Sequence, residues 1–260
     1  MDLQLSNKII LITGGSSGIG EGIARQVAEE GGIPVIASRN EGRNKALLAQ
    51  LAEAGKEAHS FHGELGEVGF CERLVQETVE RFGRIDAVVN NAGRNDGVGL
   101  ASGNPAAFLG SLNENLSHYY NLAHFALPWL KATKGCILNI SSKVALTGQG
   151  NTSGYAAAKG AQLALTREWA AELLPFGVRV NAILPAEVLT PLYENWLQGF
   201  ENPAEKLATI TSKIPLERRM TTAEEIASAA VFLLSPRASH ITGQWWVVDG
   251  GYVHLDRALT

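Results

Sequence analysis

The chain has 260 residues, of which 45% are hydrophobic and 18% are charged. This composition suits one α/β domain with a sizeable core and argues against intrinsic disorder. The formal net charge of −4, from 22 Lys and Arg against 26 Asp and Glu, argues against binding to nucleic acids or membrane surfaces. Glycine is in excess, with 28 of 260 residues against a usual share of roughly 7%.

The expected location is the cytoplasm. No stretch approaches the roughly 18 apolar residues of a membrane span. The start, Met1-Asp2-Leu3-Gln4, lacks the basic and apolar regions of a signal peptide. Two cysteines, Cys71 and Cys136, are too few for a disulfide framework and suit a reducing compartment.

Strand and helix patterns alternate along the chain. A β-branched run at residues 8–12 predicts a strand buried on both faces, and the helix over 20–30 ends at Gly31-Gly32. The same reasoning predicts strands at 34–37, 85–89, 136–140, 178–183 and 244–248. Helices are predicted at 41–54, 70–82, 113–130, 154–174 and 223–234, with Pro128 kinking its helix or lying near its end. This order predicts an α/β fold in three αβα layers, with a parallel sheet covered by helices on both faces.

Residues 190–215 interrupt this alternation. They mix prolines with Tyr193, Trp196 and Phe200, whose spacing could line one face of a helix. Such an insert is either a surface helix packed on the body or a lid over a binding site.

A glycine-rich turn follows the first strand. Thr13-Gly14-Gly15-Ser16-Ser17-Gly18-Ile19-Gly20 stands between a strand and the start of a helix. Such a turn needs positive φ or close backbone approach, and the helix N-terminus offers free N–H groups to a diphosphate. The context therefore predicts a dinucleotide site.

The end of the second strand bears on which dinucleotide binds. An acidic residue there would hydrogen-bond the ribose hydroxyls and repel a 2′-phosphate. This chain has Ser38 and Arg39 instead, and a hydroxyl and a fixed cation suit a phosphate. The sequence therefore favours NADP over NAD.

Tyr155 and Lys159 are four residues apart in a predicted helix, so they share one face. A phenol with a reference pKa of about 10 is a poor base near neutrality, and a neighbouring ammonium lowers that pKa. Ser142, in the loop after a predicted strand, could hydrogen-bond a substrate oxygen.

Taken together, these motifs resemble the short-chain dehydrogenase/reductase family over essentially the whole chain. The resemblance rests on residues 13–20, Asn90-Asn91-Ala92-Gly93, Asn115, Ser142, the Tyr155/Lys159 pair and Asp249-Gly250-Gly251. It implies a single Rossmann-type doubly wound domain over residues 1–260, a nicotinamide cofactor and a homotetramer.

The resemblance also implies roles. Tyr155 would be the acid/base, Lys159 would lower its pKa and bind the nicotinamide ribose, and Ser142 would orient the substrate oxygen. Asn115 would hold a water that links Lys159 to solvent. The implied cofactor-binding residues are Gly14, Ser16, Ser17, Gly18, Ile19, Gly20, Ser38, Arg39, Glu64, Leu65, Asn91, Ala92, Gly93, Tyr155, Lys159, Pro185, Val188 and Thr190.

The chain departs from the family pattern in two places. Glu64 stands where the family often has Asp near the end of the third strand, so its adenine contact is in question. Ala186 follows Pro185 where the family usually has Gly, so the local backbone is expected to differ.

The residues around the predicted site are polar, as a sugar with several hydroxyls would require. Candidate substrate residues are Asp96, Lys143, Gln149, Asn151, Glu187, Tyr193 and Trp196. His118, Tyr119 and Tyr120 follow Asn115 and add to this polar set. The six histidines complete no recognisable zinc site, so no metal is expected.

A narrower similarity is to the bacterial L-fucose dehydrogenases of this family. It rests on residues 95–100, 148–155, 185–188 and 254–259. It implies hydride transfer between NAD(P) and a sugar hydroxyl, with oxidation at C1 of L-fucose or a related aldose to the lactone. Two alternatives stay open: an NADPH-dependent reductase of carbonyl compounds or 3-oxoacyl thioesters, and a nicotinamide-binding protein without turnover.

Overall fold

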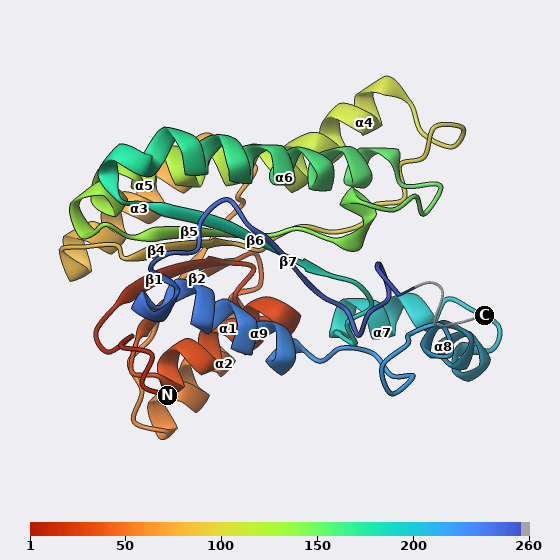
Figure 1. Ribbon diagram of the computed structural model, residues 1–260, viewed down its shortest axis with the longest axis horizontal. Coiled ribbons are helices and arrows are strands. Elements are labelled where there is room, and N and C mark those ends of the chain that lie inside the picture. Colours follow the sequence, from red (N-terminus) through yellow and green to blue (C-terminus); the bar gives the residue numbers. More distant parts are fainter. Residues whose placement is uncertain (256–260) are drawn as a thin grey trace.

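The computed structural model describes residues 1–255 and shows a seven-stranded, entirely parallel sheet between two layers of helices (Figure 1). The strand order is β3-β2-β1-β4-β5-β6-β7, which is doubly wound, so the predicted Rossmann-type αβα fold is confirmed. The strands are β1 (Ile9–Thr13), β2 (Ile33–Ser38), β3 (His59–His62), β4 (Ala87–Asn90), β5 (Cys136–Ile140), β6 (Arg179–Pro185) and β7 (Trp245–Val248).

The two helical layers cover opposite faces of the sheet. One layer holds α1 (Gly18–Glu29), α2 (Glu41–Glu53) and α9 (Ala223–Leu234), and the other holds α3 (Val68–Phe82), α4 (Pro105–Leu112), α5 (His118–Thr133) and α6 (Ser153–Leu173) (Figure 1). Alternate residues of β1 enter different cores: Ile10 and Ile12 pack towards α1 and α9, whereas Ile9 and Leu11 pack towards α3 and α5. Burial on both faces explains why this strand reads as a continuous apolar run.

The predicted helix over 113–130 is present, but its bounds and its regularity differ from the prediction. The segment consists of a π-helical turn over Asn113–Ser117 and α5, and α4 runs directly into it from residue 105. The helix continues past Pro128 to Thr133. Sequence periodicity missed α4, whose start is set by the Asn104 side chain accepting from the Ala107 N–H and by Pro105 in its first turn.

The insert over 190–215 contains two short helices, α7 (Pro191–Leu197) and α8 (Pro203–Thr211), at one end of the molecule (Figure 1). The three aromatic rings do form a continuous edge-to-face chain, because Trp196 lies 5.1 Å from Tyr193 and 4.8 Å from Phe200 between ring centroids. Phe200 lies beyond the end of α7, so the chain of rings is made by the loop as well as by a helix face. None of the helices within residues 1–255 is long and apolar enough to cross a membrane.

Candidate functional site

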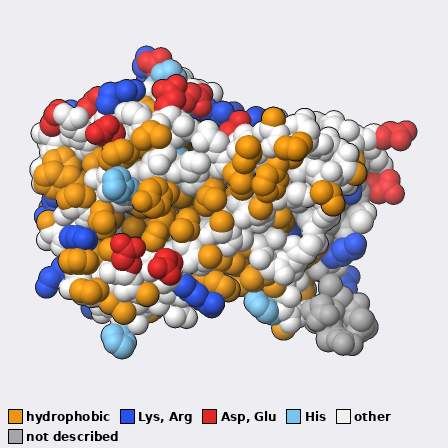
Figure 2. All heavy atoms as spheres, turned by 90° about the horizontal axis from the view of Figure 1, so that it is seen from above, with side chains coloured by type: hydrophobic (Ala, Val, Ile, Leu, Met, Phe, Trp, Pro, Cys, Tyr) orange, Lys and Arg blue, Asp and Glu red, His pale blue; other side chains and the backbone are white. Residues whose placement is uncertain are grey.

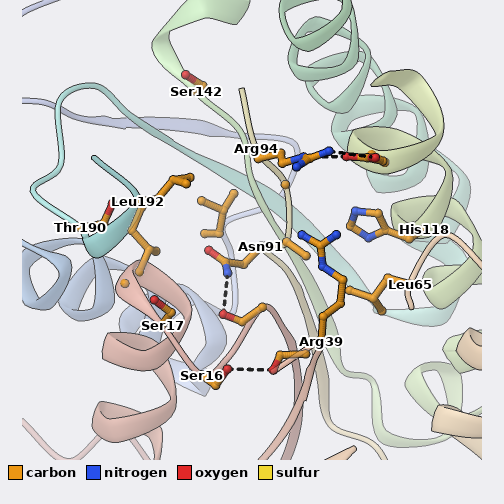
Figure 3. A pocket seen from close by; sticks show the side chains of 18 of the residues that line it. Ser16, Ser17, Arg39, Leu65, Asn91, Arg94, His118, Ser142, Thr190 and Leu192 are labelled. Atoms are coloured by element: carbon orange, nitrogen blue, oxygen red, sulfur yellow. Dashed lines mark hydrogen bonds and ion pairs between the residues drawn. The ribbon is translucent and has the colours of Figure 1, made fainter. Parts of the chain in front are cut away.

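A cleft of about 700 Å³ opens at the carboxyl ends of the strands, where the chain winds outwards from β1 in one direction and from β4 in the other. This switch point is where ligands bind in open α/β sheets. The cleft runs from the glycine-rich turn after β1 to the loop after β5, where Ser142 lies. In Figure 3, Ser16 and Ser17 line one part, Arg39 projects into the cleft, and His118 faces it from α5.

The glycine-rich turn depends on its glycines for two different reasons. Gly14 and Gly18 adopt left-handed backbone, with φ of +64° and +55°. Gly20 has ordinary φ, but a Cβ there would lie 2.3 Å from the Gly14 carbonyl oxygen and 2.6 Å from Asn91 Nδ2. Both requirements predicted from the sequence, positive φ and close approach, are therefore present.

The N-terminus of α1 points its backbone amides at the cleft. Ser17 is the N-cap residue, and its side chain accepts no hydrogen bond from the first turn of the helix. The first amides of an α-helix have no partner within the helix, so these remain available to an anion. The residues present therefore fit a dinucleotide diphosphate.

Asn91 ties the turn to the neighbouring strand. Its Nδ2 donates to the Thr13 carbonyl at 2.9 Å, and the Thr13 hydroxyl accepts from the backbone N–H of Asn91 and Ala92 at 2.9 and 3.0 Å. Figure 3 shows the Asn91 amide directed at the turn. The second asparagine of the Asn-Asn-Ala-Gly motif thus holds β1 and β4 in register at the base of the cleft.

The two polar side chains at the end of β2 differ in exposure and in hydrogen bonding. Ser38 is buried, and its hydroxyl is shared with Ser16 at 2.8 Å and with Asn44 Oδ1 at 2.6 Å. Arg39 is more than half exposed and lies 3.9 Å from Glu64, measured from Nη1 to Oε2. Of the two residues expected to meet a 2′-phosphate, Arg39 is therefore the more exposed one.

A second arginine at this end was missed by the sequence analysis. Arg43, in the first turn of α2, lines the cleft and donates from Nη1 to the Ser17 hydroxyl at 3.3 Å. The sequence could have indicated this residue, because Arg43 stands four residues after Arg39, in the first turn of a helix whose N-cap residue is Asn40. The helix places the guanidinium beside the glycine-rich turn.

Tyr155 and Lys159 share the face of α6 that borders the cleft, as predicted. The Lys159 ammonium is buried and donates to the Ile140 carbonyl at 2.7 Å and to the Tyr119 hydroxyl at 3.4 Å. It lies 5.4 Å from the Tyr155 ring centroid. Ser142, the N-cap residue of a 3₁₀ turn over Lys143–Ala145, lines the cleft with them.

The pKa of Tyr155 shifts opposite to the sequence-based expectation. Burial raises the pKa of the Tyr155 phenol to about 12, and only a hydrogen bond with Ser142 opposes this. Burial also lowers the pKa of the Lys159 ammonium to about 7, so this side chain carries only part of its charge near neutrality. Desolvation is the largest cause of both shifts, and residue spacing cannot reveal it.

The π-helical turn holds Asn115 beneath the cleft, fully buried and not among its lining residues. Its Oδ1 accepts from the Arg94 N–H at 2.8 Å and its backbone carbonyl accepts from Gln162 Nε2 at 2.8 Å. A Cβ on Gly93 would lie 2.9 Å from Asn115 Oδ1 and 3.8 Å from Lys159 Nζ. Gly93 therefore lets the backbone pass close to both side chains.

The three residues after Asn115 that were expected to make the site polar differ in burial and in contacts. Tyr119 is fully buried and joins Lys159 to the sheet, since its hydroxyl donates to the Ile140 carbonyl at 3.0 Å. His118 is buried against the cleft with neither ring nitrogen hydrogen-bonded, and burial lowers its pKa to about 4. Tyr120 points outwards and is 55% exposed.

Beside Ser142, at the far end of the cleft, three predicted substrate residues form one network, and one of them, Tyr193, lines the cleft. Lys143, from the 3₁₀ turn after β5, forms an ion pair with Glu187, which follows β6. The other oxygen of Glu187 accepts from the Tyr193 hydroxyl of α7 at 2.6 Å, so the network ties α7 to the two loops. Burial and the adjacent carboxylate raise the pKa of Tyr193, which keeps its phenol protonated.

The remaining predicted residues divide into those that line the cleft and those that do not. All predicted cofactor-binding residues except Gly20 line it. Of the predicted substrate residues only Tyr193 does. The others lie outside the lining, on loops, on the 3₁₀ turn after β5 or on α7: Asp96, Lys143, Gln149, Asn151, Glu187 and Trp196. Ala186 has no positive φ, so the backbone accommodates it without strain. Residues 256–259 of the C-terminal segment used in the narrower resemblance lie outside the described residues.

No group of three or more His, Cys, Asp or Glu side chains within residues 1–255 is arranged to hold a metal ion.

Comparison with known proteins gives consistent matches over the whole chain. A family model described as enoyl-(acyl carrier protein) reductase matches residues 14–253. An L-fucose dehydrogenase of Rattus norvegicus is 37% identical over 249 residues, which cover 95% of this chain and 90% of that protein. A 3-oxoacyl-[acyl-carrier-protein] reductase of Thermotoga maritima is 31% identical over 252 residues, which cover 96% of this chain and 100% of that protein.

Solved structures match as closely. Cj0485 dehydrogenase superimposes with a TM-score of 0.95 at 50% identity, covering 100% of this chain and 99% of that one. The aldohexose dehydrogenase of Thermoplasma acidophilum superimposes with a TM-score of 0.86 at 28% identity, covering 95% and 94% of the two chains. The expected similarity to L-fucose dehydrogenases is confirmed, here with mammalian proteins rather than bacterial ones.

Proposed function

The chain belongs to the short-chain dehydrogenase/reductase family, and on that premise we propose that it oxidises L-fucose or a related aldose at C1 to the lactone. Family membership makes it an NAD(P)-dependent oxidoreductase that acts on hydroxyl or carbonyl groups. The proposal adds the substrate, the direction of the reaction and the residues that carry it out.

The network of Lys143, Glu187 and Tyr193 is the observation that carries the sugar assignment. It begins directly after Ser142, and its phenol lines the substrate end of the cleft, with the paired ammonium and carboxylate next to that phenol. Donors and acceptors of this kind read hydroxyl groups, whereas an acyl chain or a steroid needs apolar walls. The similarity to L-fucose and aldohexose dehydrogenases supports the same assignment.

We assign the chemistry to the four residues named from the sequence. Tyr155 removes the proton from the C1 hydroxyl, Ser142 hydrogen-bonds the same oxygen, and Lys159 stabilises the phenolate of Tyr155. Asn115, held by the π-helical turn, supports Lys159 in this set of catalytic residues. The nicotinamide cofactor, when bound, supplies the acceptor for the hydride that leaves C1.

Because the pKa of Tyr155 is raised, reduction and oxidation differ in how easily Tyr155 reaches the protonation state that each requires. A phenol with a pKa of about 12 is protonated at pH 7 and is ready to donate a proton to a carbonyl oxygen. Oxidation requires the phenolate, so it depends on positive charge near the ring. Lys159 supplies such a charge to the extent that its own ammonium is protonated, with a pKa of about 7.

We assign the diphosphate to the turn over Gly14, Ser16, Ser17, Gly18 and Ile19, and the 2′-phosphate of NADP to Arg39 and Arg43. The free amides of α1 and the left-handed glycines support the first assignment. Two guanidinium groups on the cleft wall support the second, and Glu64 opposes it because it already pairs with Arg39. NADP is therefore the preferred cofactor, with NAD as the alternative.

The remaining cofactor contacts follow the cleft. We assign the adenosine half to Leu65, Asn91 and Ala92 with Glu64 at its rim, and the nicotinamide half to Gly93, Lys159, Pro185, Val188 and Thr190. Gly20 acts by close packing beneath the turn. Residues 190–215 would act as a lid, since Tyr193 of α7 joins the substrate network.

We also propose a cytoplasmic homotetramer. Apolar side chains gather on the face over α5 and α6 (Figure 2), where Tyr120 is 55% and Trp129 36% exposed. Tyr120 packs with His124 and Trp169, at centroid distances of 5.9 and 6.5 Å. An exposed apolar face of this kind suits burial against another subunit. Both cysteines are free and buried, as a reducing compartment allows.

A second candidate is a reductase of 3-oxoacyl thioesters, favoured by the similarity to the Thermotoga maritima reductase. The charged network at the substrate end argues against it. A spectrophotometric screen separates the two: aldoses with NADP or NAD in the oxidative direction, and 3-oxoacyl thioesters with NADPH in the reductive direction. Saturable oxidation of L-fucose or L-galactose supports the proposal, and activity confined to thioesters would refute it.

A further inference from the structure

The C-terminal Asp249-Gly250-Gly251 motif lies outside the cofactor contacts, yet it forms a tightly held turn. The buried Asp249 carboxylate accepts from the backbone N–H of Gly251 at 2.8 Å and of Val253 at 2.7 Å. Gly250 and Gly251 both have left-handed backbone, with φ of +64° and +84°. Side chains with a Cβ strain such conformations, so the glycines let the chain reverse immediately after β7.

The same turn is attached to the end of the lid segment. The Gly250 carbonyl accepts from the Leu216 N–H at 2.9 Å. A Cβ on Gly250 would lie 2.9 Å from Ile214 Cγ2, so the two segments pack without room for a larger residue. The turn is therefore anchored both by its own hydrogen bonds and by the chain that follows α8.

This double anchoring places Tyr252 against the substrate network. The Lys143 ammonium lies 4.1 Å from the Tyr252 ring centroid, within the range of a cation–π contact. Lys143 is also paired with Glu187, and its side chain is only 12% exposed. The ammonium has three N–H donors, and its contacts with Glu187 and with the Tyr252 ring fix their directions.

We propose that Tyr252 is a positioning residue that fixes the Lys143 ammonium so that its remaining N–H donor binds a hydroxyl of the sugar substrate. This inference rests on the proposed function for its ligand, but the contact between Tyr252 and Lys143 can be tested without any substrate. It gives the C-terminal motif a role in substrate selection: the two glycines and Asp249 shape the turn, and the turn aims the ring.

The kinetic test compares Tyr252→Leu with Tyr252→Phe in the full-length enzyme. Phe keeps the π face that holds the ammonium, whereas Leu is also apolar but is smaller and has no ring. With L-fucose as the substrate, we expect Tyr252→Leu to raise KM about five- to tenfold while kcat stays within twofold, and Tyr252→Phe to behave like the wild type. The Kd of NADP, measured by quenching of intrinsic fluorescence, should be unchanged in both.

The structural test observes Lys143 directly in the protein without ligands. A ring face 4.1 Å from the ammonium shifts the adjacent methylene protons upfield, which NMR of 13C-labelled lysine detects, with Lys143→Met used for assignment. The shift should persist in Tyr252→Phe and disappear in Tyr252→Leu.

The outcomes separate the two proposals. A wild-type enzyme that oxidises no aldose refutes the proposed function, and the NMR measurement still decides whether Tyr252 orders Lys143. A wild-type enzyme active on L-fucose, together with an unchanged KM in Tyr252→Leu, refutes the positioning role alone. Equal losses in the Phe and Leu variants also refute it, because packing rather than the π face would then be responsible.

Discussion

The two ends of the cleft are built in different ways. The dinucleotide end is formed by short continuous segments, chiefly residues 13–20 and 38–43, whose backbone conformation is set locally by glycines and by helix starts. The substrate end joins Lys143, Glu187, Tyr193 and Tyr252, which come from four separate segments. A short sequence motif can therefore predict the dinucleotide end, whereas the substrate end is formed only when the sheet brings distant segments together.

The largest effect is expected at Tyr155, which lies where the two ends of the cleft meet. We expect Tyr155→Phe to lower kcat about 10³-fold or more, because general acid–base catalysis contributes 10²–10⁴-fold. The Kd of NADP, measured by fluorescence titration, should change less than twofold. Turnover close to the wild type would contradict the assignment of Tyr155.

The dinucleotide end should be sensitive to added atoms near its backbone. Gly20→Ala places a Cβ 2.3 Å from the Gly14 carbonyl, so we expect a loss of about 2–3 kcal/mol in the free energy of unfolding and weaker NADP binding. Chemical denaturation measures the first and calorimetry the second. Gly110→Ala, in the exposed helix α4 with no atom near its Cβ, is the matched control and should unfold no more easily than the wild type.

The substrate end should respond to changes of charge without affecting the dinucleotide. Glu187→Gln keeps the size of the side chain but removes the charge that pairs with Lys143. We expect KM for the aldose to rise about tenfold while the Kd of NADP is unchanged. Equal weakening of both ligands would show that the two ends are not separate.

Within the dinucleotide end, the two arginines should distinguish NADP from NAD. Removing Arg39 or Arg43 should each weaken NADP binding about tenfold, since each charged hydrogen bond contributes about 1.5 kcal/mol, and should leave NAD binding unchanged. Arg73→Ala on α3, away from the cleft, is the control. Equal weakening of NAD binding would contradict the assignment to the 2′-phosphate.

The smallest expected effect is on the pH profile. The pKa of Tyr155 is raised to about 12, so the phenolate fraction increases as pH rises from 6 to 9. The phenolate fraction rises about tenfold per pH unit, but the Lys159 ammonium, with a pKa of about 7, loses its charge over the same range. The kcat/KM for aldose oxidation should therefore rise by no more than about tenfold, mostly between pH 6 and 7, and that for the reverse reduction should not rise. An oxidation rate that falls with pH would contradict a protonated Tyr155 at neutrality.

Most of the fold follows from patterns visible along the chain. Strand β1 is a continuous apolar run because both of its faces are buried, and α1 ends at Glu29, just before Gly31, whose φ is +80°. The segment between β4 and β5 was less readable, because the π-helical turn at Asn115 breaks the 3.6-residue period. Polar character alone also overstated the substrate site, since Gln149 and Asn151 are exposed on a loop.

The sequence by itself determined the parallel sheet, the glycine-rich turn and the Tyr155/Lys159 pair, because strand burial, positive φ and helical spacing are local properties. Tertiary structure alone decided which charges meet and how deeply each is buried. It raised the pKa of Tyr155 by desolvation, brought Arg43 to Ser17, and joined Lys143 to Glu187 across two loops. These outcomes depend on distances between segments far apart in the chain, and spacing along the sequence does not encode them.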